Sequence, residues 1–267
     1  MRTATVAALA AVALTGLLAG CAAAGPSAVA VSGATASPSA DAVTGTVTVF
    51  AAASLTPTFT ELGRRFEDAH PGAHVAFSFA GSSDLVSQLV EGAPADVFAS
   101  ADEANMGKAS KAGVIAGSPV DFATNVLAIA VPPGNPASVA AFSDLSKPAV
   151  KTVVCAPQVP CGAATARVEA ATHVTLKPVS EESSVTDVLG KVESGEADAG
   201  IVYASDVRSA GTKVESVPFP EAASTINTYP IAAVKDSANP AAAAAFIRFV
   251  TGTGARAVLK TAGFGAP

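Results

Sequence analysis

The feature that most constrains this chain is an alternation of short apolar runs with helical patterns, which begins near residue 46. Thr46–Phe50 has the pattern of a strand, and Leu55, Phe59, Leu62 and Phe66 then recur at helical spacing. The same alternation predicts strands at 74–79, 96–99, 126–131, 152–155, 199–203 and 229–234, and helices at 82–90, 102–112, 162–171, 184–194, 240–250 and 255–261. Strand–helix–strand repeats of this kind indicate parallel sheets covered by helices.

Two stretches, "VFAAASL" at 49–55 and "FAGSSDL" at 79–85, mark predicted strand-to-helix turns. Ligands of open parallel sheets bind beyond the carboxyl ends of strands. The first N–H groups of a helix have no intrahelical partner and carry partial positive charge, so they can bind an anion. Ser54 and Ser82 add hydroxyl donors, and small residues leave room for a ligand. The alternative is that Ser54 and Ser82 or Ser83 only cap their helices.

The first 45 residues read as export and tethering sequence. Residues 1–20 carry Arg2 and a short apolar section that ends in small residues, as a secretion signal does. The apolar section ends in "LAGC" at residues 18–21, which resembles the bacterial lipobox, so Cys21 is the expected lipidation site. The alternative is an ordinary secretion signal with an incidental cysteine. Residues 22–45 contain no aromatic residue, Leu or Ile, so they predict a flexible tether.

Composition excludes several classes of partner. The net charge is −6 and tryptophan is absent, so neither nucleic acid nor an anionic membrane surface is expected as a partner. The three histidines are scattered, which argues against a metal site. Cys155 and Cys161 form a disulfide candidate, because an exported chain meets an oxidising compartment. Two free cysteines are the alternative.

No motif marks an enzyme. Ser54 or Ser82 could serve as a nucleophile, but the chain has no G-x-S-x-G turn and no histidine in a motif that marks a base. Walker and Rossmann glycine motifs are also absent from the sequence. The adjacent acids Glu181 and Glu182 fall in a polar loop and are expected to be solvated. We therefore expect no catalytic residues.

Six segments together, "VTVFAAASL", "FAGSSDL", "GAPADVFASAD", "VPCGAAT", "SVTDVLGKV" and "AGIVYASD", resemble the molybdate-binding proteins of ABC transporters, over about residues 46–265. The likeness extends to the actinobacterial lipoprotein members, in which paired cysteines also occur. The resemblance implies an α/β, two-lobed periplasmic-binding-protein fold of type 2. Each lobe would be a mainly parallel sheet covered by helices, with residues 46–125 and 228–267 in lobe 1, 126–227 in lobe 2, and the ligand in the cleft.

The resemblance also implies a set of oxyanion-binding residues. Ser54 and Ser82 match the family's serines, and Tyr203 matches its tyrosine. Backbone N–H groups at Cys161 and Val185 match two further donors, although the loop before Cys161 is about one residue shorter than in some members. By residue pattern alone, Tyr203 is a core aromatic at a strand end and Val185 a core residue of a helix.

The implied function is capture of molybdate or tungstate between two lobes by neutral donors. No cofactor is expected, and molybdenum would be present only within the bound oxyanion. The partners would be an ABC permease and its ATPase, with the membrane reached through lipid on Cys21. We expect a monomer, anchored on the outer face of the cell membrane. The alternatives are another small oxyanion, such as sulfate, on the same fold, and an extracellular enzyme.

Overall fold

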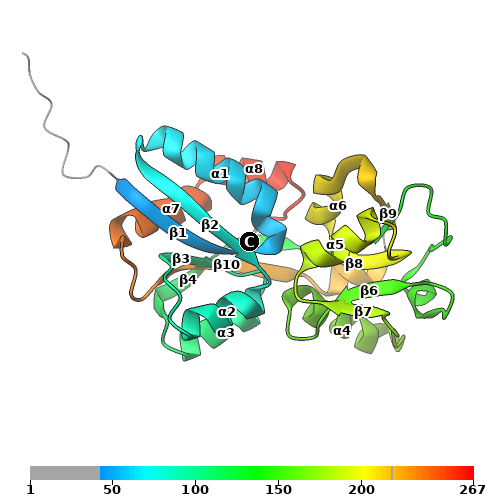
Figure 1. The fold of residues 1–267 in the computed structure, drawn as a ribbon. Coiled ribbons are helices and arrows are strands. Elements are labelled where there is room, and N and C mark those ends of the chain that lie inside the picture. Colours follow the sequence, from blue (N-terminus) through cyan, green and yellow to red (C-terminus); the bar gives the residue numbers. More distant parts are fainter. Residues whose placement is uncertain (1–42, 218) are drawn as a thin grey trace, which may run out of the picture. The chain divides into compact units, whose positions relative to one another are not determined.

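The computed structural model describes residues 43–217 and 219–267, which form two five-stranded sheets (Figure 1). Sheet A has the order β2-β1-β3-β10-β4 and sheet B the order β7-β6-β8-β5-β9. The strands are β1 Thr44–Ala52, β2 Gly72–Ala80, β3 Val97–Ala99, β4 Ile115–Asn125, β5 Leu127–Val131, β6 Thr152–Cys155, β7 Ser180–Glu182, β8 Ala199–Tyr203, β9 Glu215–Val217 and β10 Asn227–Val234. The signal segment, Cys21 and residues 22–42 of the expected tether lie outside the described residues.

The described residues also form eight α-helices and four short 3-10 turns, of which α7 and α8 follow the last strand. The helices are α1 Thr56–Ala69, α2 Ser82–Val90, α3 Glu103–Lys111, α4 Pro160–Thr172, α5 Val185–Glu193, α6 Ala204–Ala210, α7 Pro240–Thr251 and α8 Thr253–Thr261. The 3-10 turns are η1 Ala53–Leu55, η2 Phe142–Ser146, η3 Gly211–Lys213 and η4 Pro220–Ser224. The predicted α/β class is therefore confirmed.

Both sheets are mixed, with one reversed strand each. In sheet A, β1 pairs in parallel with β2 and β3, while β10 is antiparallel to β3 and β4. In sheet B, β6 pairs in parallel with β7 and β8, while β5 is antiparallel to β8 and β9. The reversed strands β5 and β10 are those that the chain enters when it passes from one sheet to the other.

Alternation along β1 divides the core of sheet A into two layers. Val47, Val49 and Ala51 point to the layer that α1, α7 and α8 cover, whereas Phe50 points to the layer under α2 and α3. In the first layer Phe59 packs on three other phenylalanines: Phe77, Phe122 and Phe246. Sheet B has one continuous core that also includes Ala53 of η1, so this turn of the first segment packs into the core of sheet B.

The predicted elements are present, with small shifts at their ends, and several others were missed. β1 begins at Thr44, two residues before the expected start, and β6 and β8 have the predicted bounds. The sequence analysis did not predict β4, β7, β9 or α6. Most of β4 is exposed because it is an edge strand, and Gly117, Ser118, Pro119 and Asp121 interrupt its apolar residues, so the sequence contains no apolar run there.

Two crossovers join the sheets, and an asparagine lies at each. The first runs from the end of β4 at Asn125 to β5, and the second from η4 to the start of β10 at Asn227. The two asparagines are register partners in the β4–β10 pair. The crossovers therefore lie side by side although about 100 residues separate them in the sequence.

Between residues 43 and 267, Pro218 aside, no single helix is long and apolar enough to cross a bilayer. Helices α7 and α8 together have the length and the apolar composition of a membrane span, but a bend of 59° separates them.

Candidate functional site

A small cavity lies where the two sheets and their helices meet. Its lining is Ala52, Ala53, Ser54, Gly81, Ser82, Ala101, Val159, Pro160, Cys161, Val185 and Tyr203. All five predicted site residues are in this set, although they come from five separate segments of the chain. The cavity volume is about 10 Å³, which is room for about one water molecule. A larger ligand would fit only if the two sheets moved apart.

Four helical segments begin at this cavity: η1, α2, α4 and α5. The first N–H groups of each have no intrahelical acceptor, and the helix dipoles place partial positive charge at these ends. None of the eleven lining residues carries a charged side chain. The cavity wall is therefore neutral overall and rich in hydrogen-bond donors.

Ser54 does not cap a helix, so the capping alternative is wrong for this residue. It is the middle residue of η1, and α1 begins after Leu55 with no side-chain cap. Its hydroxyl oxygen is 3.0 Å from the Tyr229 hydroxyl, which also accepts a hydrogen bond from Asn125 Nδ2 at 3.4 Å. Either hydroxyl can be the donor in this pair. Because Tyr229 accepts from Asn125, its own proton can go to Ser54, and in that arrangement the Ser54 proton can face the cavity.

Ser82 is also not a cap. The N-cap of α2 is Gly81, no side chain caps that helix, and the Ser83 hydroxyl instead contacts Asp84. The buried Ser82 hydroxyl accepts a hydrogen bond of 3.0 Å from the Ala101 N–H. The Ser82 proton therefore remains available to a group in the cavity.

Tyr203, at the end of β8, is almost fully buried, and its hydroxyl accepts a hydrogen bond of 2.8 Å from Asn227 Nδ2. Burial raises the pKa of Tyr203 well above its usual value of 10. The phenol therefore stays neutral and can act as a donor.

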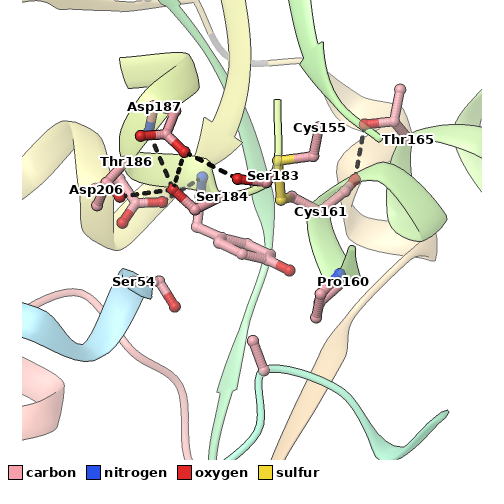
Figure 2. The surroundings of a disulfide bond; sticks show 12 residues. Ser54, Cys155, Pro160, Cys161, Thr165, Ser183, Ser184, Thr186, Asp187 and Asp206 are labelled. Carbon is pink, nitrogen blue, oxygen red and sulfur yellow. Dashed lines mark hydrogen bonds between the residues drawn. A yellow bond between two sulfur atoms is a disulfide. The ribbon is translucent and has the colours of Figure 1, made fainter. Parts of the chain in front are cut away.

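Cys161 and Val185 bring backbone donors rather than side chains. Cys161 is the second residue of α4 and is bonded to Cys155, with a Cα–Cα separation of 5.7 Å (Figure 2). Val185 is the first residue of α5, whose N-cap Ser184 accepts a hydrogen bond from the Asp187 N–H. The side chains of Val185 and Tyr203 lie in the core of sheet B, so the core interpretation describes their packing.

Gly81 and Ser183 lie against each other across the cavity rim. A methyl group built on Gly81 would overlap the carbonyl oxygen of Ser183 and would lie 3.7 Å from a methyl group of Val159. Gly81 belongs to the sheet A side and Ser183 to the sheet B side. The backbones can approach this closely only because residue 81 has no side chain.

Several polar residues around the site were missed by the sequence analysis: Asn125, Asn227, Tyr229, Ser205 and Asp206. All five are buried, and Asn125 Nδ2 also donates to the Ser205 hydroxyl at 2.8 Å. The missed tyrosine and asparagines lie on β4 and β10, and the other two residues begin α6. No local motif marks Asn125, Asn227 and Tyr229, because the crossovers bring them to the site from distant parts of the sequence. Ser205 and Asp206 directly follow Tyr203 in the segment "AGIVYASD", which could have indicated them.

Asp206 is a buried acid next to the site. Burial raises its pKa to about 7, although the Tyr203 N–H, 2.9 Å from Oδ2, partly offsets this. A raised pKa means that the stabilising contribution of the neutral acid is fully present below pH 3.8 and is lost as the pH rises through 7.

We expect Asp206→Asn to raise the midpoint of thermal unfolding at pH 8 by about 5 °C and to change it little at pH 4. The reason is that the asparagine side chain has no charge to bury, while its amide oxygen can still accept the hydrogen bond from the Tyr203 backbone N–H. Unfolding curves between pH 4 and 8 test this, with the exposed Asp236→Asn as the control. An equal effect at both pH values would contradict the assignment.

Comparison with known proteins decides the family. A family model described as "Bacterial extracellular solute-binding protein" matches residues 47–265. This chain belongs to that family. A 52% identical relative of this solute-binding protein is the molybdate-binding protein ModA of Mycobacterium tuberculosis, over 209 residues that cover 78% of this chain and 80% of the relative.

Solved structures agree on the fold of this solute-binding protein. The periplasmic molybdate-binding protein of Azotobacter vinelandii matches with a TM-score of 0.71 and 26% identity, over 83% of this chain and 99% of that one. The sulfate-binding protein SubI of Mycobacterium tuberculosis H37Rv matches with a TM-score of 0.67 and 24% identity, over 82% and 86% of the two chains. The second likeness concerns the fold alone.

Family membership confirms three expectations. The chain is a two-sheet solute-binding protein, it is a non-enzymatic component of an ABC transporter, and it acts outside the cytoplasm. Its transport partners are accordingly a permease and an ATPase. The prediction that the chain is not an enzyme rests on this membership.

Proposed function

We propose that this protein captures molybdate, and tungstate equally well, outside the cell membrane and delivers the oxyanion to its permease. The observation that supports the proposal is that hydrogen-bond donors line the cavity. The hydroxyls of Ser82 and Tyr203 each accept from an N–H group, which leaves the hydroxyl proton free, and the Ser54 hydroxyl lies 3.0 Å from that of Tyr229. Four helix starts add backbone N–H groups, and no acidic side chain lines the cavity.

A wall of this kind favours an oxyanion that has no proton. Every oxygen of such an anion accepts hydrogen bonds, and a buried oxygen without a donor would be costly. Phosphate carries a proton near neutral pH and would need an acceptor in the wall. The Tyr203 and Ser82 hydroxyls already accept from Asn227 and from the Ala101 N–H, and no carboxylate lines the wall, so a phosphate proton would meet no acidic acceptor there.

Size would then separate the unprotonated candidates. Molybdate and tungstate are nearly the same size, and sulfate is smaller, so a cavity fitted to the larger anions would lengthen the hydrogen bonds to sulfate. Sulfate remains the second candidate because the sulfate-binding protein SubI shares the fold. For each of these anions the cavity must widen from its size here and close again around the ligand.

The widening would be a relative movement of two lobes about the crossovers. We assign residues 46–125 and 228–267 to lobe 1 and 126–227 to lobe 2. The pairing supports this division, since β4 ends at Asn125, β5 begins at Leu127, and β10 returns to sheet A from Asn227. In the same proposal the protein is a monomer, with residues 1–20 removed as a signal and lipid on Cys21 holding it on the outer face of the membrane.

Titration calorimetry tests the function most directly. We expect the chain from residue 22 onward to bind molybdate and tungstate one-to-one with similar affinity, and to give no heat with sulfate or phosphate. Tight binding of sulfate instead would keep the fold and change the ligand. No binding of any of the four anions would contradict the proposed function. Tyr203 and Tyr229 are the only tyrosines and tryptophan is absent, so tyrosine fluorescence reports on the same site.

A further inference from the structure

Asn227 connects the two sides of the cavity through one amide group. It is buried, with 2% exposure, and lies at the second crossover. Its Nδ2 is 3.0 Å from the Ala101 carbonyl oxygen on the sheet A side, 3.4 Å from the Pro160 carbonyl oxygen at the start of α4, and 2.8 Å from the Tyr203 hydroxyl. The amide therefore contacts both sides and one of the proposed ligand donors.

The surroundings of Asn227 fix which way its amide faces. Arg167 Nη2 donates to Oδ1 at 2.7 Å, and a guanidinium can only donate. The carbonyl oxygens of Ala101 and Pro160 can only accept, so Nδ2 must face them. With the amide in this orientation, the Tyr203 oxygen receives a hydrogen bond from Nδ2 and keeps its own proton for another acceptor.

We propose that Asn227 is a positioning residue that directs the Tyr203 proton into the cavity and holds the two sides together when the site is closed. Arg167 supports this role because its guanidinium donates a hydrogen bond to the Asn227 Oδ1 and so fixes the orientation of the amide. The inference rests on the proposed function for its effect on affinity. The hydrogen-bond direction at Tyr203, however, exists without any ligand and can be tested separately.

Asn227→Asp is the informative change because it keeps the shape and reverses the hydrogen bond. A carboxylate can still accept from Arg167, but it can only accept from Tyr203, whose proton would then point away from the cavity. Asn239→Asp is the matched control: it makes the same change in charge at the N-cap of α7 and likewise removes an amide that donates to two backbone carbonyl oxygens, those of Thr44 and Thr46.

The first measurement needs no ligand. With ¹³Cζ-labelled tyrosine, the chain from residue 22 onward gives two signals, which Tyr203→Phe assigns. We expect Asn227→Asp to move the Tyr203 signal and leave the Tyr229 signal nearly unchanged, whereas Asn239→Asp moves neither. An unmoved Tyr203 signal in a folded Asn227→Asp protein would overturn the proposal, whether or not the protein binds an oxyanion.

The second measurement is a double-mutant cycle with molybdate as the probe. We expect Tyr203→Phe to weaken binding about tenfold and Asn227→Asp by at least as much. In the Tyr203→Phe background, Asn227→Asp should cost at least about threefold less than it costs alone. Fully additive losses would mean that the carboxylate only repels the anion, and would overturn the directing role.

Arg167→Met keeps the test open if Asn227→Asp fails to fold. Arg167 is exposed, so its loss should leave the fold intact, but it frees the amide oxygen from its donor. We expect a smaller movement of the Tyr203 signal and about threefold weaker molybdate binding. The exposed Arg248→Met should change neither. Equal results for the two arginine variants would count against the proposal.

Discussion

Replacing Gly81 by alanine is expected to weaken oxyanion binding by about a hundredfold, because the new methyl group would keep the two sides of the cavity from closing around the ligand. The new methyl group would overlap the Ser183 carbonyl oxygen, which is backbone and cannot rotate away. Overpacking of this kind costs about 1–3 kcal/mol in any state in which Gly81 and Ser183 approach as closely as they do here. Calorimetry with molybdate gives the affinity, and thermal unfolding without ligand gives the stability.

Gly107→Ala is the matched control for this change. Gly107 lies on α3, on the same side of the cavity as Gly81, and a methyl group there would meet no atom within 4 Å. Alanine at this position should leave affinity unchanged and favour the helix slightly. If Gly81→Ala bound molybdate as tightly as the parent, the two sides could not approach each other at Gly81 in the bound state.

The double change Ser54→Ala and Ser82→Ala should weaken molybdate binding by about a thousandfold. Each serine is expected to donate one hydrogen bond to a charged ligand, and such bonds contribute about 1.5–3 kcal/mol each. The hydroxyls come from different helix starts, so the two single losses should add approximately. Calorimetry of both single variants and of the double variant measures each step.

Ser87→Ala is the control here, because this exposed serine of α2 bonds only to the Ser83 carbonyl oxygen among the described residues. Thermal unfolding would show whether loss of the Ser54–Tyr229 contact disturbs the fold. Unchanged affinity in both single variants would rule out the site assignment, and a loss in Ser54→Ala alone would remove Ser82 from it.

The sequence identified the donors whose position is local. Ser54 and Ser82 follow apolar strands and precede helices, whereas Cys161, Val185 and Tyr203 were indicated as donors only by the family resemblance. Such patterns predict strand ends and helix starts, because strand and helix periodicity is written in neighbouring residues. Their capping roles were not predictable in the same way. The sequence allowed Ser54 to be either a helix cap or a hydroxyl that faces the ligand, and only the structure shows that it lies within η1 beside the Tyr229 hydroxyl.

The reversed strands and the polar residues behind the donors depend on contacts between distant residues. Polar residues, glycine and proline interrupt the apolar residues of strand β4, so only its pairing with β10 identifies it. Asn125 and Asn227 have no motif, and their closeness follows from that same pairing. The direction of the hydrogen bond at Tyr203 depends on Asn227, and Asn125 donates to the Tyr229 hydroxyl that lies beside Ser54.

The sequence by itself thus determined the alternation of strands and helices, the α/β class, and the five segments from which the donors come. Only the tertiary structure decided that these segments surround one cavity, that Gly81 and Ser183 meet at its rim, and which hydroxyl protons remain free. The physical reason is that periodicity and capping act within a few residues, whereas hydrogen-bond direction and close backbone approach depend on groups that meet only after the two sheets have formed.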